Sequence, residues 1–501
     1  MTVLLAGVVL VSLAAGIGLA RRLGHGGTTR IAALLLPLAL SGVALATWGT
    51  FRLLPSWSWS ACRLTAAVRL GHGLPLYTPV GGTAVNDWIY GPVGALAYTP
   101  AALAPSPLPA LQIAAALNAL YFLLPALVVF LATIRQPVTQ LWGSIGLVFS
   151  VAALLAPFGT WSGAAVLHVD VVTVALGVLS CVALARHDQL PLAAGLAVLS
   201  VWTKQTEVAL LPAQLGYVAF VHGRRRTVAY AAWLGALGLV ATGVFVTWFG
   251  FETLWHDLVV IPGRHALEWE RLGRTLSDFL LAAGWTGPVA WLAWRNRRDL
   301  PTADQRTGAL LLFAAAVLLP LGTLSALKHG SGPNSLHSIT YAVLGAALLL
   351  VHLAAAAPAR VTRIAGAGLL AGLIAVLAID VDRVLRFGHL TRPEPGRQHE
   401  EAFEFARAHP VQTYFPWNTL ATLMAEGRND PFEYGYHDWK LANSAPTPAA
   451  LRASLPAGLT FVIYHENDQR PFELLALFPE FTVGRQAGGW LLFTRPPAGS
   501  P

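Results

Sequence analysis

Long apolar runs separated by short polar segments dominate the first 390 residues of the chain. Ten of these runs are long enough, or nearly so, to cross a hydrocarbon core of roughly 30 Å. They occupy about residues 2–20, 31–54, 109–134, 141–157, 168–185, 228–249, 277–294, 308–327, 338–356 and 364–383. A further stretch, 190–221, is too long for one crossing and is interrupted at residues 204–207, Lys-Gln-Thr-Glu. The pattern therefore predicts a polytopic α-helical membrane protein with about eleven or twelve transmembrane helices.

Arginines gather in alternate connections between the apolar runs, and this asymmetry orients the chain. The first run has no basic residue before it and is followed by Arg21 and Arg22, which predicts an N-terminus outside the cell. The stretch 190–221 must then cross twice, because a single crossing would place the three arginines at 224–226 outside. The same alternation predicts that the loop 55–108, the interruption at Lys204 and everything after about 384 lie on the outer face.

The loop 55–108 is predicted to contain segments that lie along the membrane interface. Residues 60–72 alternate Arg63 and Arg69 with apolar positions at a helical spacing. Four prolines interrupt the apolar stretch 92–108, which favours a second interfacial segment over a full crossing.

From about residue 391 the composition becomes that of a small aqueous domain. Acidic residues become frequent, and short alternating apolar runs predict strands interspersed with helices, hence an extracytoplasmic α/β domain over 391–501 that follows a membrane domain over 1–390. The predicted strands are Val411–Phe415, Leu459–Tyr464, Phe481–Val483 and Trp490–Thr494, and the predicted helices are 398–408, 417–426 and 470–477.

The amino-acid composition supports a membrane protein and excludes other classes of protein. Charged residues make up 12% of the chain and hydrophobic residues 55%, which excludes both a water-soluble enzyme and a disordered protein. The net charge of +8 lies in the connections between apolar runs, so no nucleic-acid partner is predicted. Cys62 and Cys181 fall at different depths and are not expected to form a disulfide. Abundant alanine and the preference for arginine over lysine suggest a bacterial cell membrane.

Ionisable residues near the outer ends of the apolar runs are the candidates for function, because polar groups at a membrane boundary are costly unless they are paired or used. A carboxylate beside several cations suits transfer of a group from a phosphate-activated lipid. The carboxylate can take a proton from an acceptor hydroxyl, while Lys, Arg or His stabilises the departing phosphate.

Each of these residues also has a purely structural interpretation. Asp170 could cap the helix that follows it. Lys204 and Glu207 are three apart and could pair with each other. Asp87 follows glycines and Asn86, a composition typical of a turn.

The sequence gives no support for a metal or nucleotide cofactor. The histidines at 256, 265, 329 and 337 could form a divalent-metal site, but they lack the spacings of common zinc motifs, so no cofactor is predicted. No Walker loop, Rossmann fingerprint or nucleophile elbow is present in the sequence.

Four stretches together, in this order, resemble a known family of membrane enzymes. They are Gly71–Tyr77 followed by Trp88–Pro92, then His168–Val172, Trp202–Thr206 and Lys328–Asn334. The series resembles GT-C type membrane glycosyltransferases, the group that contains protein O-mannosyltransferases and the lipid A aminoarabinose transferase.

This resemblance implies a sugar donor carried on polyprenyl phosphate, an acceptor from the cell envelope that enters at the outer face, and inversion at the anomeric carbon. In the family, an acidic residue near the start of the first outer loop acts as the base. Residues 56–60, Ser-Trp-Ser-Trp-Ser, hold no carboxylate at that place. Asp87, later in the same loop, is therefore the first candidate for the base, and Asp170 is the second. Donor-phosphate contacts are predicted for Lys204, Arg264, Lys328, His329 and Asn334, and acceptor or supporting roles for Tyr90, His168, Glu207, His256 and Asp257.

The sequence thus predicts a mannosyltransferase-like membrane glycosyltransferase that acts on a glycan, lipid or protein of the cell envelope. A non-catalytic binder or flippase of lipid-linked glycans is the first alternative, and a secondary transporter, which would want ionisable groups at the bilayer midplane, is the second. The C-terminal domain is predicted to help hold the acceptor, with Tyr434, Tyr436, His437 and Trp439 available to stack on sugar faces.

Overall fold

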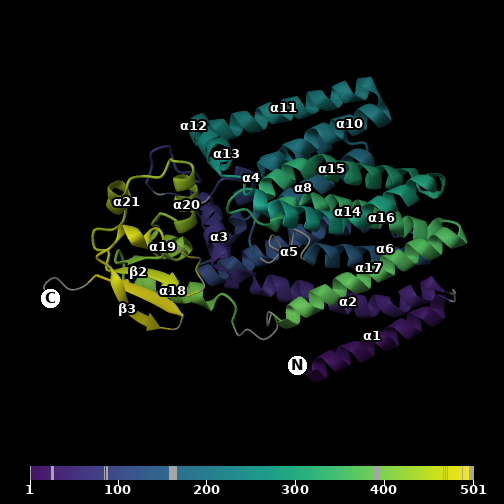
Figure 1. Ribbon diagram of the computed structural model, residues 1–501, viewed down its shortest axis with the longest axis horizontal. Coiled ribbons are helices and arrows are strands. Elements are labelled where there is room, and N and C mark those ends of the chain that lie inside the picture. Colours follow the sequence, from purple (N-terminus) through teal and green to yellow (C-terminus); the bar gives the residue numbers. More distant parts are fainter. Residues whose placement is uncertain are drawn as a thin grey trace.

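The computed structural model describes residues 2–23, 27–83, 85, 88–131, 133–156, 166–386, 394–466, 468, 470, 472–487 and 489–495. Long helices run along the long axis of the molecule, and a small domain that contains the C-terminal strands covers one of their ends (Figure 1). This arrangement confirms the predicted fold class: a helical membrane protein with a small C-terminal α/β domain.

Seven helical segments in the described part of the chain are long and apolar enough to cross a membrane. They are α2 (Thr28–Leu53) with the 3₁₀ turn η1 (Leu54–Ser56), α5 (Pro107–Leu131), α6 (Pro137–Leu155), α11 (Arg224–Phe249), α15 (Thr302–Ala326), α16 (Ser338–Ala356) and α17 (Ala359–Arg386). Five further helices accompany them, namely α1 (Thr2–Leu23), α8 (Val169–Ala185), α9 (Leu190–Val201), α10 (Leu210–His222) and α14 (Leu272–Arg295). That these five helices also cross the membrane, which would give the predicted total of eleven or twelve crossings, stays a prediction.

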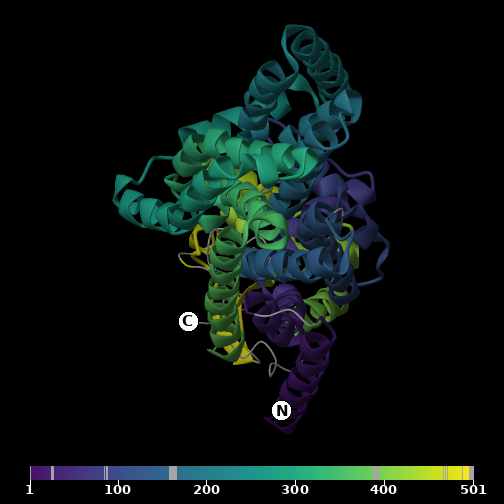
Figure 2. The same ribbon diagram turned by 90° about the vertical axis from the view of Figure 1, so that its right-hand side faces the viewer.

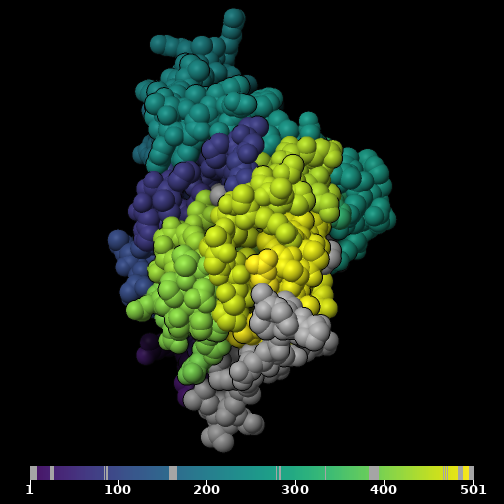
Figure 3. All heavy atoms as spheres, turned by 90° about the vertical axis from the view of Figure 1, so that its left-hand side faces the viewer, coloured from purple at the N-terminus to yellow at the C-terminus, as the bar shows by residue number. Residues whose placement is uncertain are grey.

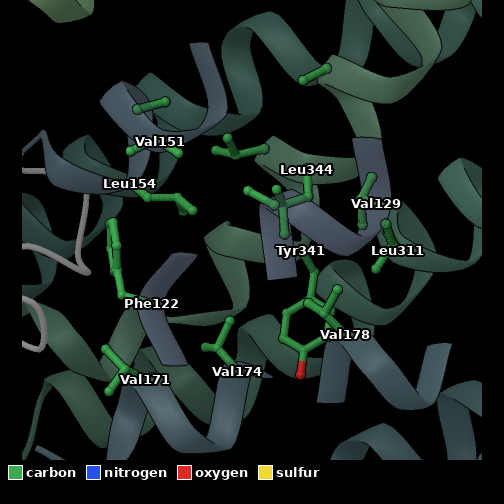
Figure 4. Packing of buried hydrophobic residues seen from close by; sticks show 14 of the residues in the cluster. Phe122, Val129, Val151, Leu154, Val171, Val174, Val178, Leu311, Tyr341 and Leu344 are labelled. Atoms are coloured by element: carbon green, nitrogen blue, oxygen red, sulfur yellow. The ribbon is translucent and has the colours of Figure 1, made fainter. Parts of the chain in front are cut away.

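The centre of the bundle is an apolar core shared by α5, α6, α8, α15 and α16. Figure 4 shows Phe122, Leu154, Val174 and Leu344 converging there from four of these helices. Tyr341 on α16 projects from the same cluster with its hydroxyl group at the edge. Seen from one end, α1 lies at one margin of the bundle and the α10–α11 pair projects at another (Figure 2).

The predicted interruption of the stretch 190–221 is confirmed. Helix α9 ends at Val201, Lys204 has an extended backbone, and a 3₁₀ turn η3 (Gln205–Ala209) leads into α10. Pro191 and Pro212 each lie in the first turn of a helix. Backbone N–H groups there have no intrahelical acceptor, so the missing N–H of proline costs no hydrogen bond. The two short helices therefore present Lys204 from a break in regular structure.

The outer loop packs its backbone against this break. The amides of Gly91 and Val93 donate to the carbonyls of Thr203 and Trp202, at 3.2 and 3.3 Å. A Cβ atom at position 91 would lie 1.7 Å from the Trp202 carbonyl oxygen, so the close approach requires glycine. The Gln205 side-chain amide also donates to the carbonyl of Ile89, at 2.6 Å. These contacts hold the segment 89–93 beside Lys204.

The loop 55–108 forms a helix where the sequence predicts one, α3 (Ser58–Gly71), followed by the short helix α4 (Pro92–Leu96) and the 3₁₀ turn η2 (Thr99–Leu103). The prediction of short segments over 92–108 is thus confirmed. The prediction of an amphipathic surface helix at 60–72 is not, because both Arg63 and Arg69 are buried. Helix α3 is covered by the C-terminal domain on one side, since it packs against α19 (Thr419–Glu426) as well as η2.

Between α11 and α14 the chain forms a run of short helices on the same end of the bundle. These are α12 (Phe251–Trp255), the π-helical turn η4 (His256–Val260), α13 (Ile261–Arg264) and η5 (Trp269–Arg271). The 3₁₀ turns η6 (Arg297–Asp299) and η7 (Pro333–Leu336) lie in later connections. Leu267 and Lys328 form an antiparallel bridge that ties this run to the connection between α15 and α16.

The C-terminal domain is built on a four-stranded sheet of order β1-β2-β4-β3. Its strands are β1 (Thr413–Tyr414), β2 (Phe461–His465), β3 (Thr482–Ala487) and β4 (Trp490–Thr494), and its helices are α18 (Arg397–Ala408), α19, α20 (Glu433–Leu441) and α21 (Pro448–Ser454). All four predicted strands and the first two predicted helices are confirmed. The predicted helix 470–477 is wrong, since that region has a 3₁₀ turn η8 (Leu475–Leu477) in place of an α-helix. Figure 3 shows the domain covering the centre of this end beside residues of the first outer loop.

Candidate active site

A cavity of about 1160 Å³ lies between the ends of the membrane helices and the C-terminal domain. Its membrane side is formed by α3, the segment 89–90, the break at Lys204 and the connections 258–271 and 328–335. Its opposite side is formed by Trp417, by α20 and by residues 470 and 473. We call the first side the floor and the second side the roof. The cavity is large enough for more than one ligand, since pockets for small molecules are typically about 300 to 1,000 Å³.

Lys204 lines the floor of the cavity and is held there by Asp170. The Lys204 Nζ atom donates to Asp170 Oδ1 at 2.5 Å, and both side chains are nearly inaccessible to solvent. Asp170 is in the first turn of α8, one helix away in sequence from the break. The cavity is lined by Lys204 and His168, whereas Asp170 lies behind them. The ammonium group therefore occupies a fixed position at the cavity surface.

Three other side chains surround the Asp170 carboxylate. Asn334 donates to Oδ2 at 2.8 Å, His168 contacts the same oxygen, and His337 Nδ1 lies 3.9 Å from Oδ1. The N-cap residue of α8 is His168, and Asp170 lies in the first turn, where a carboxylate suits the helix dipole. The contacts also make Asp170 the centre of a polar cluster below the cavity.

Glu207 forms a second layer beneath this cluster. It is fully buried, pairs with His337 Nε2, and accepts a hydrogen bond from the Tyr341 hydroxyl at 3.2 Å. This is the hydroxyl at the edge of the apolar cluster in Figure 4. The alternative in which Lys204 and Glu207 pair with each other is wrong, because the two side chains contact Asp170 and His337 instead. Glu207 does not line the cavity, so of the acceptor or supporting roles predicted for it, its position fits a supporting role.

Arg63 is a floor residue that the sequence analysis did not identify as part of the site. Its guanidinium carbon lies 5.3 Å from the ring centroid of Trp59 and 5.0 Å from that of Tyr90, so the cation is held between two aromatic faces. Tyr90 in turn has its hydroxyl 3.2 Å from His168 Nε2. The helical spacing at 60–72 could not reveal this role, because it predicted that Arg63 lies on a helix at the membrane interface. The neighbouring tryptophans were the one local signal.

The other predicted phosphate ligands differ in their positions. Lys328, His329 and Asn334 line the cavity, but Lys328 Nζ already donates to the Pro262 carbonyl at 2.6 Å and His329 pairs with Glu268. Burial lowers the pKa of Lys328. Arg264 donates to the Ala442 carbonyl of the C-terminal domain and does not line the cavity, so a phosphate contact from it does not fit its position.

His256 and Asp257 are buried beside the cavity and do not line it. The His256 ring packs edge-on against Trp439 at 4.8 Å, and its Nδ1 atom lies 3.7 Å from Asp257 Oδ1. Burial raises the pKa of Asp257 to about 6, and the nearby His256 opposes this shift. The pair lies where the connection 250–271 meets the C-terminal domain. Of the acceptor or supporting roles predicted for these residues, this position fits a supporting role.

The roof carries carboxylates rather than cations at most of its polar positions. Of the described carboxylates, Glu433, Asp438 and Glu473 line the cavity. Glu433 accepts hydrogen bonds from the Tyr464 hydroxyl and from backbone amides of residues 473 and 474. Burial raises its pKa to about 7. Glu473 contacts His437 at 2.8 Å and Lys440 at 3.2 Å.

The four aromatic residues predicted to meet a sugar divide between two faces of α20. Tyr434 and His437 line the cavity, as predicted. Tyr436 is buried in the core of the C-terminal domain, and Trp439 packs against Val85 and Ile261. Helical periodicity places residues 434 and 437 on one face and residues 436 and 439 on another, so the expectation for these last two is wrong.

Asp87, the first candidate for the base, lies outside the described residues. Its neighbours Ile89 and Tyr90 line the cavity, and Val85 is packed under the C-terminal domain. Cys62 and Cys181, the two cysteines of the chain, are both buried and do not form a disulfide with each other, as expected.

The fold is similar to that of a solved bacterial enzyme. No protein-family model matches the sequence, and a search of curated proteins gave no match. The crystal structure of ArnT from Cupriavidus metallidurans bound to undecaprenyl phosphate has a TM-score of 0.56 and 12% sequence identity, over 92% of this chain and 98% of that chain. The apo structure of the same protein has a TM-score of 0.48 and 13% identity, over 91% of this chain and 97% of that chain. The chain therefore has the GT-C fold of ArnT, the lipid A aminoarabinose transferase, along nearly its whole length.

Proposed function

We propose that this protein is a glycosyltransferase of the bacterial cell membrane that moves a sugar from a polyprenyl-phosphate donor to a cell-envelope acceptor at the outer face. One observation carries the proposal: a buried lysine, held by a carboxylate, is presented at the surface of a large cavity between the membrane helices and an aqueous domain. The likeness in fold to an enzyme crystallised with undecaprenyl phosphate supports a donor of this lipid class.

Lys204 and Arg63 are the floor cations that we assign to the donor phosphate. An ammonium group has three N–H donors, and the contact with Asp170 takes one of them. A phosphate that leaves with the donor lipid gains negative charge at its bridging oxygen. Fixed cations in a site partly shielded from water stabilise that charge without reorganisation.

Asp170 is proposed to position Lys204 rather than to act as the base. Its oxygens are occupied by Lys204, Asn334 and His168, and it lies behind the cavity surface. An acceptor hydroxyl still needs a base, and the described carboxylates of the roof are engaged in contacts of their own. Asp87, two positions before the cavity residue Ile89, remains the proposed base.

The experiment uses the purified full-length protein in nanodiscs with radiolabelled decaprenyl-phosphate mannose and decaprenyl-phosphate arabinose. Turnover of either donor, as transfer to a cell-envelope extract or as slow hydrolysis, supports the proposal. Donor binding without any turnover would instead favour the non-catalytic binder or flippase. Failure to bind any polyprenyl-phosphate sugar would reject the function.

The roles of the two carboxylates are separated by comparing Asp87→Asn with Asp170→Asn. We expect the first variant to bind donor normally and to turn over at least about a hundredfold more slowly, as expected for loss of a general base. The second variant should raise the KM for the donor, because Lys204 loses its anchor. If Asp87→Asn works at the wild-type rate and Asp170→Asn does not turn over, the base is Asp170. If both keep full rate, the carboxylate-base mechanism is wrong.

A further inference from the structure

Four aromatic side chains form a continuous surface that extends from the floor of the cavity to its roof. It consists of Trp59 on α3, Trp417, and Tyr434 and His437 on α20, and we call these four residues the aromatic wall. The ring centroids of Trp59 and Tyr434 are 4.6 Å apart, those of Trp59 and Trp417 are 5.3 Å apart, and those of Tyr434 and His437 are 5.6 Å apart. All four residues line the cavity.

The wall is assembled from two parts of the chain and is held in place. Trp59 comes from the first outer loop, whereas the other three residues come from the C-terminal domain. The Tyr434 hydroxyl donates to the Gly330 carbonyl at 3.3 Å, which joins the wall to the loop that carries Asn334. Trp417 and Tyr436 belong to the buried core of the domain, so the wall rests on packed side chains. Trp59 packs edge-to-face against Tyr434 and Trp417, at 73° and 80°, so these rings fix one another in place. Trp417 is buried, whereas Tyr434 and His437 are partly exposed.

Hydrogen-bonding groups stand beside these rings. Glu473 lines the cavity next to His437, which it contacts at 2.8 Å, and its carboxylate can accept further hydrogen bonds from hydroxyl groups. Glu433 lines the cavity at the start of the same helix. Aromatic faces flanked by carboxylates match a sugar, which has an apolar C–H face and a rim of hydroxyl donors.

Charge separates this region from the donor site. The floor presents Arg63, His168 and Lys204, which suit a phosphate, whereas the roof presents Glu433, Asp438 and Glu473 along with Arg470. A phosphate would be repelled by the roof carboxylates, and a neutral hydroxyl-rich ligand would not. The volume of about 1160 Å³ leaves room for such a ligand beside the sugar phosphate on the floor.

We propose that the roof is an acceptor subsite for a neutral saccharide, with a sugar ring seated on Tyr434 beside His437 and its hydroxyl groups donating to Glu473. The proposal rests on the proposed function and narrows it: the acceptor is a glycan chain rather than the side chain of a protein or the hydroxyl of a simple lipid.

Binding is measured on the full-length protein in nanodiscs against an array of neutral oligosaccharides of mannose, galactose, arabinose and N-acetylglucosamine. The wild type should bind at least one of these families. Tyr434→Ala should weaken that binding by roughly tenfold, because it removes one stacked face. Tyr434→Phe keeps the ring and loses only the hydroxyl contact with Gly330, so it should bind like the wild type.

Donor binding distinguishes this inference from the proposed function. In Tyr434→Ala and Glu473→Gln the affinity for decaprenyl-phosphate mannose should be unchanged, whereas Lys204→Met should lose donor affinity and keep oligosaccharide binding. A protein that binds donor but no oligosaccharide on the array overturns the saccharide subsite and leaves the glycosyltransferase proposal standing. Loss of donor affinity in Tyr434→Ala and Tyr434→Phe alike would assign the wall to the donor and would also overturn the inference.

Discussion

Two buried aspartates in the membrane domain have nearly the same partners and different surroundings. Asp170 contacts Lys204, His168 and Asn334 at the end of the bundle covered by the C-terminal domain. Asp304, at the start of α15, contacts Arg186 and also lies 2.9 Å from His352 Nε2. Each cluster therefore combines a carboxylate, a cation and a histidine. In the Asp304 cluster the three come from the ends of separate helices, whereas His168 and Asp170 both lie at the start of α8.

The two clusters differ in whether the residues that contact the aspartate also line the large cavity. Lys204 and His168 line the large cavity, while Arg186 and His352 are not among its lining residues. The second cluster ties the ends of α8, α15 and α16 together. The same residue types thus form a site in one place and a structural link in the other, and the residue types alone do not distinguish the two.

The largest expected effect is on stability, at the Asp304 cluster. Arg186→Met should cost about 3 kcal/mol in the free energy of unfolding, because it removes the arginine from a buried ion pair and leaves Asp304 only its contact with His352 among those described above. The double variant Arg186→Met, Asp304→Leu should recover much of this loss. Denaturant unfolding in detergent, followed by tryptophan fluorescence, measures both. Equal destabilisation in the single and double variants would contradict the assignment of a structural link.

The next effect is on turnover, at the Asp170 cluster. Lys204→Met should lower donor turnover by about 10²- to 10³-fold, the usual cost of removing one fixed group that stabilises developing charge. Arg186→Met is the matched control: its turnover per folded molecule should stay at the wild-type level. Single-turnover assays normalised to folded protein give the comparison. If both variants lose turnover equally, the contrast between site and link fails.

The smallest effect tests a third buried carboxylate, Glu433, which is held by a hydroxyl and backbone amides in the aqueous domain. Its pKa is raised by burial from 4.5 to about 7. In this range the folded protein binds more protons than the unfolded chain, so stability falls as pH rises from about 4.5 through 7. Between pH 5 and 8 the free energy of unfolding of the wild type should fall by on the order of 1 to 3 kcal/mol. Glu433→Gln should abolish this fall. Thermal unfolding across this pH range checks it, and parallel pH curves for the variant and the wild type would contradict it.

Much of the architecture could be predicted because it depends on local pattern. The apolar runs, the break at Lys204 and the four strands each follow from a few consecutive residues, and each is present in the structure. The failures are equally specific. Arg63 was predicted to lie on a helix at the membrane interface. The domain that covers it comes more than 300 residues later in the chain, so the local pattern at 60–72 carries no information about it.

The candidate site could be predicted only as a collection of residues. Polarity at a membrane boundary marked Asp170, Lys204 and Glu207 as candidates for use or pairing, since isolated charges there are costly. This signal could not identify the partner of each residue. Lys204 contacts Asp170, 34 positions away in the sequence, and Glu207 contacts His337, 130 positions away. The sequence also marked Arg264 as a phosphate ligand on charge alone, whereas its place in the fold directs it to a carbonyl of the C-terminal domain.

The sequence by itself determined the membrane helices, the exposed domain and the position of the break, because hydrophobic length and periodicity act over neighbouring residues. Tertiary structure alone decided which side of α20 meets the cavity, which cation Asp170 holds, and that Asp170 lies behind the surface while Lys204 is on it. The physical reason is that a buried ionisable group must find its partner on whichever helix packs beside it, and helix packing is settled by the whole core rather than by any one segment.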